Sequence, residues 1–112
     1  MRLLVFVLNR VECLDELLAE LAESGIQGGT ILNSTGMATE LSHSDEYDSI
    51  FGSLRAFLDP DRAENRTILI VLKEEQVEGA MRIIRRVVGD LSQPDTGVAF
   101  TLPIDFTEGI SH

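Results

Sequence analysis

Apolar residues occur along the chain in short runs that are typical of buried strands. The clearest runs are 3–8, 67–72 and 98–102, each rich in residues that favour strands. A further strand is expected over residues 26–33, where the glycine pair 28–29 suggests a bulge or a close approach of two backbone segments. The pattern therefore predicts four strands.

In two other segments, apolar residues recur every three or four positions, which is the spacing of one helical face. The first segment follows the opening strand, and its apolar positions are Val11, Leu14, Leu17, Leu18 and Leu21. The second follows the third strand, and its apolar positions are Val77, Ala80, Met81, Ile84 and Val87. Gly25 is placed to end the first helix, because glycine enters a left-handed cap conformation without steric cost.

A long stretch, about residues 35–66, separates the second strand from the third. Its first part, 34–48, is polar and gives few structural signals. Apolar residues then return at helical spacing, which predicts a short helix near 49–58. Asp59 and Pro60 end this helix, because a proline disfavours helical geometry in the residue before it.

The predicted elements run in the order strand, helix, strand, long loop, strand, helix, strand. Two βαβ units of similar size are typical of a ferredoxin-like fold. We therefore expect one α+β domain over residues 1–112. It is a βαββαβ sandwich in which two helices cover one face of a four-stranded antiparallel sheet. The long loop between the second and third strands carries the short helix.

Two of the predicted strands are apolar at every position, which indicates that both faces of the sheet are covered. A sheet with one solvated face would alternate apolar with polar residues, but residues 3–8 and 68–72 do not alternate. The two helices cover one face only, and the long loop carries too many charges to make a good cover for the other. We therefore expect a second copy of the chain on that face, and hence a homo-oligomer.

Composition and charge narrow the classes of partner. The chain has 112 residues, with 9 basic and 19 acidic side chains and a formal net charge of −10. Such a charge disfavours nucleic acid, whose phosphates are bound by Lys and Arg. No apolar run approaches the roughly 20 residues of a membrane-spanning helix, and the single Cys13 excludes an internal disulfide. We expect a cytoplasmic protein that neither spans a membrane nor binds nucleic acid.

A short motif connects the first helix to the second strand and to the loop beyond it. It consists of Gly-Ile-Gln-Gly-Gly-Thr-Ile at 25–31, followed by Ser-Thr-Gly-Met at 34–37. Together with Asp-Thr-Gly-Val-Ala-Phe at 95–100, this pattern resembles nitrogen-regulatory signalling proteins of the PII type. The similarity covers about residues 2–103. It implies a homotrimer with three clefts between subunits, each holding an adenine nucleotide, and a long loop that engages a regulated partner protein.

The resemblance also implies where a ligand would bind. The matching positions are Thr35, Gly36 and Met37 at the base of the long loop, with Asp95, Thr96 and Gly97 on the opposite lip of the cleft. Glycine lets backbone N–H groups approach an anion, so a phosphate can bind without a side-chain charge. Arg66, just before the third strand, is the best cation near the loop base.

Two departures from the family pattern bear on the ligand. Val98 follows Gly97 where the family has a basic residue, and the segment 105–109 lacks the arginine pair that the family has near its C-terminus. A di- or triphosphate without cations around it would be poorly neutralised. We therefore do not expect tight ATP binding. A monophosphate nucleotide, another small anion, or no nucleotide at all are the alternatives, and no resident cofactor is expected.

Two other functions fit the same fold. One is that of the CutA-type divalent-cation proteins, which are also ferredoxin-like trimers, because the acidic surface of this chain could concentrate cations. Separately, the loop residues His43, Asp45, Glu46 and Asp48 are of the types that bind divalent metals. These residues follow no fixed ligand spacing, so no metal site is assigned. The other function is that of a trimeric interaction module without a small ligand.

The sequence gives little support for a catalytic function. The two histidines, His43 and His112, lack an evident orienting partner, and no Walker loop, zinc signature or Ser–His–Asp order is present. Cys13 is most simply a small buried residue. We therefore expect a regulator in signal transduction rather than an enzyme.

Overall fold

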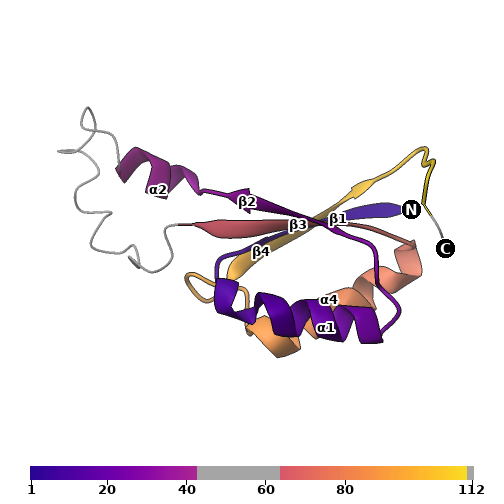
Figure 1. The fold of residues 1–112 in the computed structure, drawn as a ribbon, viewed down its shortest axis with the longest axis horizontal. Coiled ribbons are helices and arrows are strands. Elements are labelled where there is room, and N and C mark those ends of the chain that lie inside the picture. Colours follow the sequence, from indigo (N-terminus) through magenta and orange to yellow (C-terminus); the bar gives the residue numbers. More distant parts are fainter. Residues whose placement is uncertain (43–63, 111–112) are drawn as a thin grey trace.

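Two helices, α1 (Leu14–Glu23) and α4 (Val77–Val88), lie against one face of a four-stranded sheet in this computed structural model (Figure 1). The structure describes residues 1–42 and 64–110. The strands are β1 (Arg2–Leu8), β2 (Thr30–Ser34), β3 (Asn65–Leu72) and β4 (Gly97–Pro103). The shorter helices are the 3-10 helices η1 (Val11–Cys13) and η4 (Glu74–Gln76), and α2 (Met37–Ser42). The α+β, ferredoxin-like arrangement expected from the sequence is confirmed.

The strands lie in the order β2-β3-β1-β4, and every neighbouring pair is antiparallel. Leu8, the last residue of β1, lies opposite Arg66 of β3 and Gly97 of β4. The ends of β1 and β2 and the beginnings of β3 and β4 therefore meet at one end of the sheet. We call it the loop end, because the long loop leaves the sheet there (Figure 1).

The hydrophobic core lies between the sheet and the two long helices. Alternate residues of β1 and β3 are at most 4% exposed there: Leu4, Phe6, Leu8, Ile68, Ile70 and Leu72. The helices contribute Leu17, Leu21, Ala80, Ile83, Ile84 and Val88. The helical spacing of apolar residues in the sequence therefore marks the faces that pack on the sheet.

Glycine ends α1 as the sequence predicts. Gly25 has a φ of +98°, in the left-handed region. The N–H groups of Gly25 and Ile26 donate to the carbonyls of Ala22 and Leu21, both at 3.0 Å. This pair of bonds is the Schellman motif, which satisfies carbonyls that the helix end would leave unpaired.

Two elements between the first helix and the third strand differ from those predicted from the sequence. The predicted strand 26–33 is replaced by the shorter β2, which begins only at Thr30. The preceding glycines carry no side chain to pack, and glycine weakens a strand. Residues 37–42 belong to the polar stretch that gave few structural signals, and they form α2, which was not predicted. The helix predicted near 49–58 lies outside the described residues.

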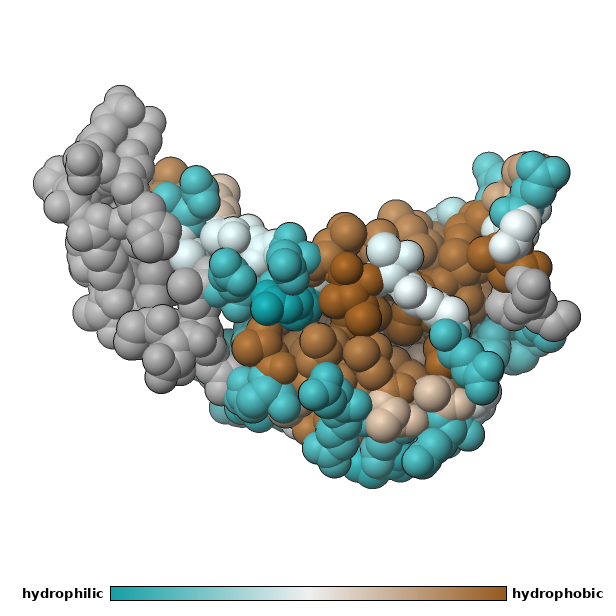
Figure 2. Space-filling model, viewed as in Figure 1, coloured by the Kyte–Doolittle hydropathy of each residue, from teal (hydrophilic) through white to brown (hydrophobic). Residues whose placement is uncertain are grey.

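The face of the sheet opposite the helices is apolar, as expected, and the described residues leave much of it open to solvent. The sheet register places Leu3, Val5 and Val7 of β1 on this face, beside residues of β3 and β4. Val98, Phe100 and Leu102 of β4 lie there at 57%, 47% and 47% exposure. Figure 2 shows hydrophobic residues along the concave upper side of the body and hydrophilic residues around the helices below. We call this surface the open face.

Candidate functional site

The base of the long loop lies at the loop end of the sheet. Thr35 and Gly36 connect β2 to α2, and Met37 is the first residue of α2. The Met37 side chain is 79% exposed. The N–H of Glu40 donates to the carbonyl of Gly36 at 3.0 Å, so the first turn of α2 begins directly at this glycine.

The backbone at Gly36 does not itself require glycine. Its φ lies outside the left-handed region, and a Cβ built on it would meet only Nδ2 of Asn65, at 3.9 Å. That distance is an ordinary van der Waals contact. Glycine at this position therefore leaves a space beside the main chain that a side chain would fill, and an anion-binding backbone segment needs such space.

Four uncharged polar side chains gather beside Gly36. Ser34 donates its hydroxyl to Oδ1 of Asn65 and lies 2.8 Å from the Thr67 hydroxyl. Nδ2 of Asn65 donates to Oδ1 of Asn9 at 3.3 Å. The cluster joins the ends of β1 and β2 to the beginning of β3. We call it the neutral cluster.

The segment 95–97 lies at the same end of the sheet, on the other side of β1. Thr96 is 1% exposed, and its hydroxyl donates to the carbonyls of Gln93 and Leu91, at 2.8 and 3.3 Å. The Thr96 carbonyl accepts from the N–H of Asn9 at 3.1 Å. Asp95 has a φ of +57°, in the left-handed region. These bonds fix the turn that leads into β4.

The packing of β4 against β1 explains why residue 97 is a glycine. A Cβ at this position would lie 2.7 Å from Cε1 of Phe6 and 2.7 Å from the carbonyl oxygen of Val7. Both distances are shorter than real Cβ contacts. The backbone of β4 therefore lies close against β1 here, and the fold alone accounts for this glycine.

The turn before this segment also contains the one pKa shift resolved among the described residues. The Asp90 carboxylate accepts from the N–H of Ser92 at 2.9 Å and from its hydroxyl at 2.8 Å. The backbone bond, followed by the side-chain bond, lowers the pKa of Asp90 below its ordinary value of 3.8. Asp90 therefore supports the turn as a carboxylate.

Arg66 lies at the loop end but on the helix-covered side of the sheet. Its register partners are Leu8 and Asn33, whereas the neighbouring Asn65 belongs to the open face. The guanidinium donates to the Asn65 carbonyl at 3.1 Å and lies 3.5 Å from a carboxylate oxygen of Glu64. Arg66 is therefore near the loop base, with an anionic partner already beside it.

The sequence-predicted site residues thus lie at one end of the sheet within a single chain. The loop base, which follows β2, and the segment 95–97, which leads into β4, lie at the same end of the sheet, with β3 and β1 between them. The family resemblance implies that the two segments form opposite lips of a cleft between subunits. Within a single chain they are two strands apart.

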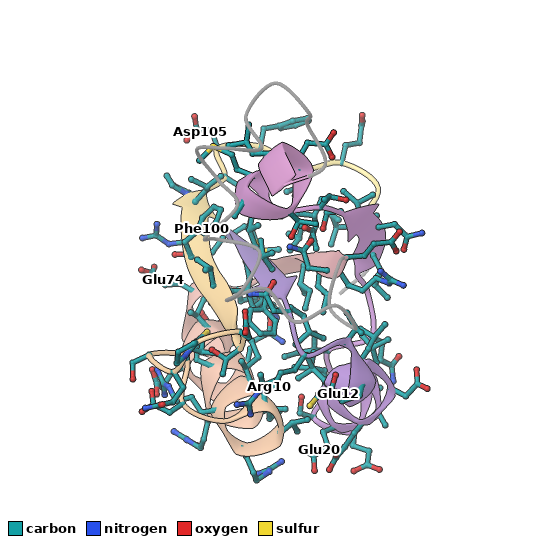
Figure 3. All side chains as sticks on the ribbon, turned by 90° about the vertical axis from the view of Figure 1, so that its left-hand side faces the viewer. Arg10, Glu12, Glu20, Glu74, Phe100 and Asp105 are labelled. Atoms are coloured by element: carbon teal, nitrogen blue, oxygen red, sulfur yellow. The ribbon has the colours of Figure 1, made fainter. Side chains whose placement is uncertain are left out.

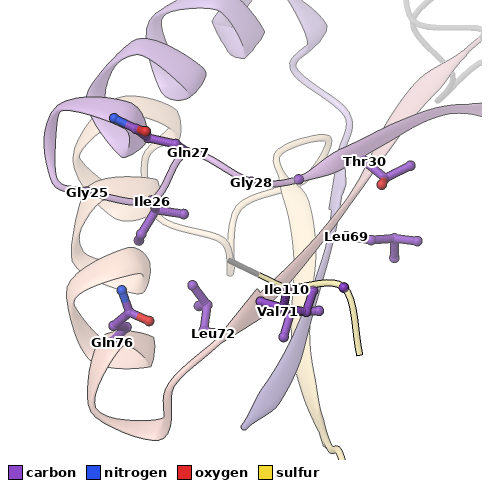
Figure 4. A pocket seen from close by; sticks show the side chains of 12 residues that line it. Gly25, Ile26, Gln27, Gly28, Thr30, Leu69, Val71, Leu72, Gln76 and Ile110 are labelled. Carbon is purple, nitrogen blue, oxygen red and sulfur yellow. The ribbon is translucent and has the colours of Figure 1, made fainter. Parts of the chain in front are cut away.

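A hollow near the opposite end of the sheet was not predicted from the sequence (Figure 4). It has a volume of about 450 Å³ and lies between the α1–β2 connection, the end of β3 and the C-terminal tail. Ile26, Leu69, Val71 and Ile110 supply apolar walls, and Gln27, Thr30 and Gln76 supply polar side chains. None of the twelve described residues that line it is charged.

A strand edge faces this hollow. The pairing of β2 with β3 ends at Thr30 and Leu69, while β3 continues to Leu72. A Cβ on Gly29 would lie 3.5 Å from the Leu69 carbonyl oxygen, so this carbonyl points toward the β2 side. Alternate residues of a strand direct their main-chain groups to the same edge. The N–H and carbonyl of Val71 therefore point to the side on which β2 has already ended.

A sequence signal for the hollow existed in the glycines at 25, 28 and 29. They were interpreted as a helix stop and a strand irregularity, but together they also remove the side chains that would fill this space. The neutral cluster had no comparable signal, because single Asn, Ser and Thr residues at strand ends are common.

Two hypotheses concern residues that the structure does not describe. The metal-binding residues proposed around His43 lie in the segment 43–63, as does the predicted helix near 49–58. Within residues 1–42 and 64–110, no group of three or more His, Cys, Asp or Glu side chains could hold a metal ion.

Comparison with known families agrees with this architecture. A family model described as nitrogen regulatory protein P-II matches residues 1–111. The chain belongs to the P-II family. A comparison with curated proteins gives no match. The P-II family consists of signalling regulators rather than enzymes, so this chain is a PII-like regulatory protein. In the described part of the chain, no helix has the length and apolar character needed to cross a membrane.

Proposed function

We propose that this PII-like protein is a cytoplasmic homotrimer that senses a small metabolite or nucleotide in clefts between its subunits. The loop 35–66 would change its interaction with a partner protein according to whether a ligand occupies each cleft. The observation that carries the proposal is the placement of two candidate binding surfaces, the loop base and the hollow, near opposite ends of the same sheet. One copy of the chain cannot bring both surfaces to one small ligand.

The distance between the two surfaces supports a site shared by two copies. Asn65, beside the loop base, and Val71, in the hollow, are six residues apart on β3, or about 20 Å. A small ligand that touches both surfaces therefore needs them from different chains. The apolar open face supports the assembly, because exposed apolar area of this kind marks protein interfaces.

The chemistry of the two surfaces suggests which part of a nucleotide each would bind. The hollow is uncharged, with apolar walls, the Thr30 hydroxyl and the Val71 main chain. Such a surface suits a flat, neutral base that makes hydrogen bonds at its edge. The space beside the main chain at Gly36 suits an anionic group. Because the Arg66 guanidinium already has Glu64 as a neighbour, we favour one phosphate or a small anion over a triphosphate.

Regulation through the loop would follow from differential binding. An effector that binds one loop conformation more tightly than another shifts the loop population toward it. A partner protein that recognises this conformation then responds to the effector concentration. A role in nitrogen metabolism is part of the same proposal, and it rests on the family alone.

A thermal-shift screen with AMP, ADP, ATP, cyclic AMP, 2-oxoglutarate and bicarbonate tests the proposal. A ligand at about 100 times its Kd adds about 2.7 kcal/mol, a shift of several degrees in a domain of this size. We expect a nucleotide or small anion to raise the Tm, and Gly36→Asp to abolish that shift by placing a carboxylate where the anion binds.

Gly79→Asp is the matched control, because it adds the same charge at an exposed position of α4 where a Cβ meets nothing within 4 Å. The control should retain the ligand-induced shift. A flat panel would rule out sensing of these ligands. A shift that persists in Gly36→Asp would place the binding site away from the loop base.

A further inference from the structure

A hydrogen-bonded path links the loop base to the Thr96–Gly97 segment within one chain. It starts at the side-chain amide of Asn65, whose Nδ2 would lie 3.9 Å from a Cβ built on Gly36. This amide donates to Oδ1 of Asn9 at 3.3 Å. The main-chain N–H of Asn9 donates to the Thr96 carbonyl at 3.1 Å. The path therefore crosses from β3 over the end of β1 to the beginning of β4.

The orientation of the Asn65 amide is set from its other side. The Ser34 hydroxyl donates to Oδ1 of Asn65 and also lies 2.8 Å from the Thr67 hydroxyl. A side-chain amide has an acceptor oxygen and a donor nitrogen. With the oxygen engaged by Ser34, the NH₂ group faces Asn9. The donor in this path is thus fixed by the end of β2, the strand from which the long loop departs.

The far end of the path is packed so that a shift of Asn9 reaches the main chain of β4. The Thr96 side chain is buried and donates to two carbonyls of its own turn. Gly97 lies against Phe6 and the Val7 carbonyl without room for a Cβ. Close-packed interiors of this kind transmit displacement instead of absorbing it.

We propose that Asn65 is a positioning residue that couples the base of the long loop to the Thr96–Gly97 segment. Its biological meaning rests on the proposed function, because it specifies how an effector at one segment changes the other. A ligand seated against Gly36 displaces the Asn65 amide, and the displacement passes through Asn9 to Thr96. By linkage, a ligand at Thr96–Gly97 biases the loop base to the same degree.

The coupling can be measured without any effector. Gly36→Ala is a small perturbation at the loop base, because its new methyl group has room. In ¹⁵N-labelled protein we expect it to move the backbone amide resonances of Asn9 and Gly97. In an Asn65→Asp background these remote shifts should vanish, because Asp keeps the oxygen facing Ser34 but presents a second oxygen to Asn9. The comparison is a double-mutant cycle, which isolates the coupling term.

Hydrogen exchange gives an independent readout. The Asn9 amide is protected by its bond to Thr96. Asn65→Asp should raise the exchange rate of this amide by about fivefold, the effect of losing one ordinary hydrogen bond. Asn9→Asp is the matched control, because it adds the same charge but keeps an acceptor opposite the Asn65 amide. It should preserve the remote shifts that Gly36→Ala causes.

Two outcomes would overturn the proposal. Remote shifts that survive in Asn65→Asp would mean that the path does not pass through this residue. Remote shifts lost equally in Asn9→Asp would mean that any added charge loosens the region. If Asn65→Asp does not fold, Ser34→Ala takes its place, since it frees the Asn65 amide to turn and should weaken the same shifts. A thermal-shift panel without a ligand response would contradict the proposed function but leave this coupling standing.

Discussion

Two glycines at the loop end of the sheet differ in what a side chain would meet. At Gly36 the nearest atom to a new Cβ is 3.9 Å away, whereas at Gly97 both a ring carbon of Phe6 and a carbonyl oxygen of Val7 are 2.7 Å away. The carbonyl belongs to a central strand and cannot move without breaking its pairing. Gly97 is therefore required by packing, whereas packing does not require a glycine at Gly36.

Gly97→Ala should destabilise the fold by about 1–3 kcal/mol, the range for inserting a methyl group into a packed region. Urea unfolding at fixed protein concentration measures this change as a lower midpoint with an unchanged slope. Gly79→Ala is the control, because Gly79 lies in α4 with open space around it, and alanine there should stabilise the helix by up to about 1 kcal/mol. Equal effects at both positions would contradict the packing argument.

For single residues, the sequence indicated which positions matter more readily than it indicated what each residue does there. Gly25 was predicted to end a helix, and its φ of +98° confirms the prediction. The pattern also singled out Gly36 and Gly97, but only the coordinates separate an open backbone from a crowded one. Asn9 and Asn65 could not be predicted as a pair, because they are 56 residues apart and meet only through the sheet register.

The end of α4 shows how one element is fixed by another that is distant in the sequence. Nη1 of Arg10, which follows β1, donates to the carbonyl of Val88 at 2.8 Å (Figure 3). Val88 is the last residue of α4, and Gly89 follows with a φ of +106°. A cation at a helix C-terminus also interacts favourably with the helix dipole. Arg10 therefore acts as a cap for α4.

Arg10→Met keeps most of the aliphatic stem but removes the donor and the charge. We expect it to lower the free energy of unfolding by about 1–3 kcal/mol, the range for a hydrogen bond to a charged group. Arg82→Met is the control, since Arg82 is an exposed arginine within the same helix. Urea denaturation should separate the two variants. A loss at Arg82 as large as that at Arg10 would argue against the cap.

Elements with long, regular patterns were predictable, and short ones were not. β1, β3 and β4 each contain a run of mostly apolar residues, and α1 and α4 repeat apolar residues over three turns. α2 has only six residues, too few for a period of 3.6 to be recognised. The strand expected at 26–33 was shortened because its glycines lie along the hollow instead of pairing with β3.

At the scale of the whole molecule, the two faces of the sheet differ in how well they are covered. The helices bury one face, and the described residues leave Val98, Phe100 and Leu102 about half exposed on the other. A run of exposed apolar residues on a regular surface is unfavourable in water, and a second copy can cover it. The proposed shared site requires that this contact also places the loop end of one copy near the hollow of another.

Phe100→Glu tests this assembly directly. If the open face is the subunit interface, the change places a charge in an apolar contact and loses the burial of a large ring, which is worth about 1.5–3 kcal/mol per copy. We therefore expect the subunit dissociation constant to rise at least about tenfold. Sedimentation velocity should show the wild type near 37 kDa, three chains of 12.3 kDa each, and the variant shifting toward one chain on dilution.

Phe106→Glu provides the matched control for this experiment. Phe106 is 77% exposed, but it lies in the tail beyond β4 and not on the sheet. The same substitution there adds the same charge, so a change specific to Phe100 reports on the open face. A monomeric wild type would contradict the trimer itself. A trimer that survives Phe100→Glu would move the subunit contact to another surface, and the shared cleft would then lose the geometry on which it depends.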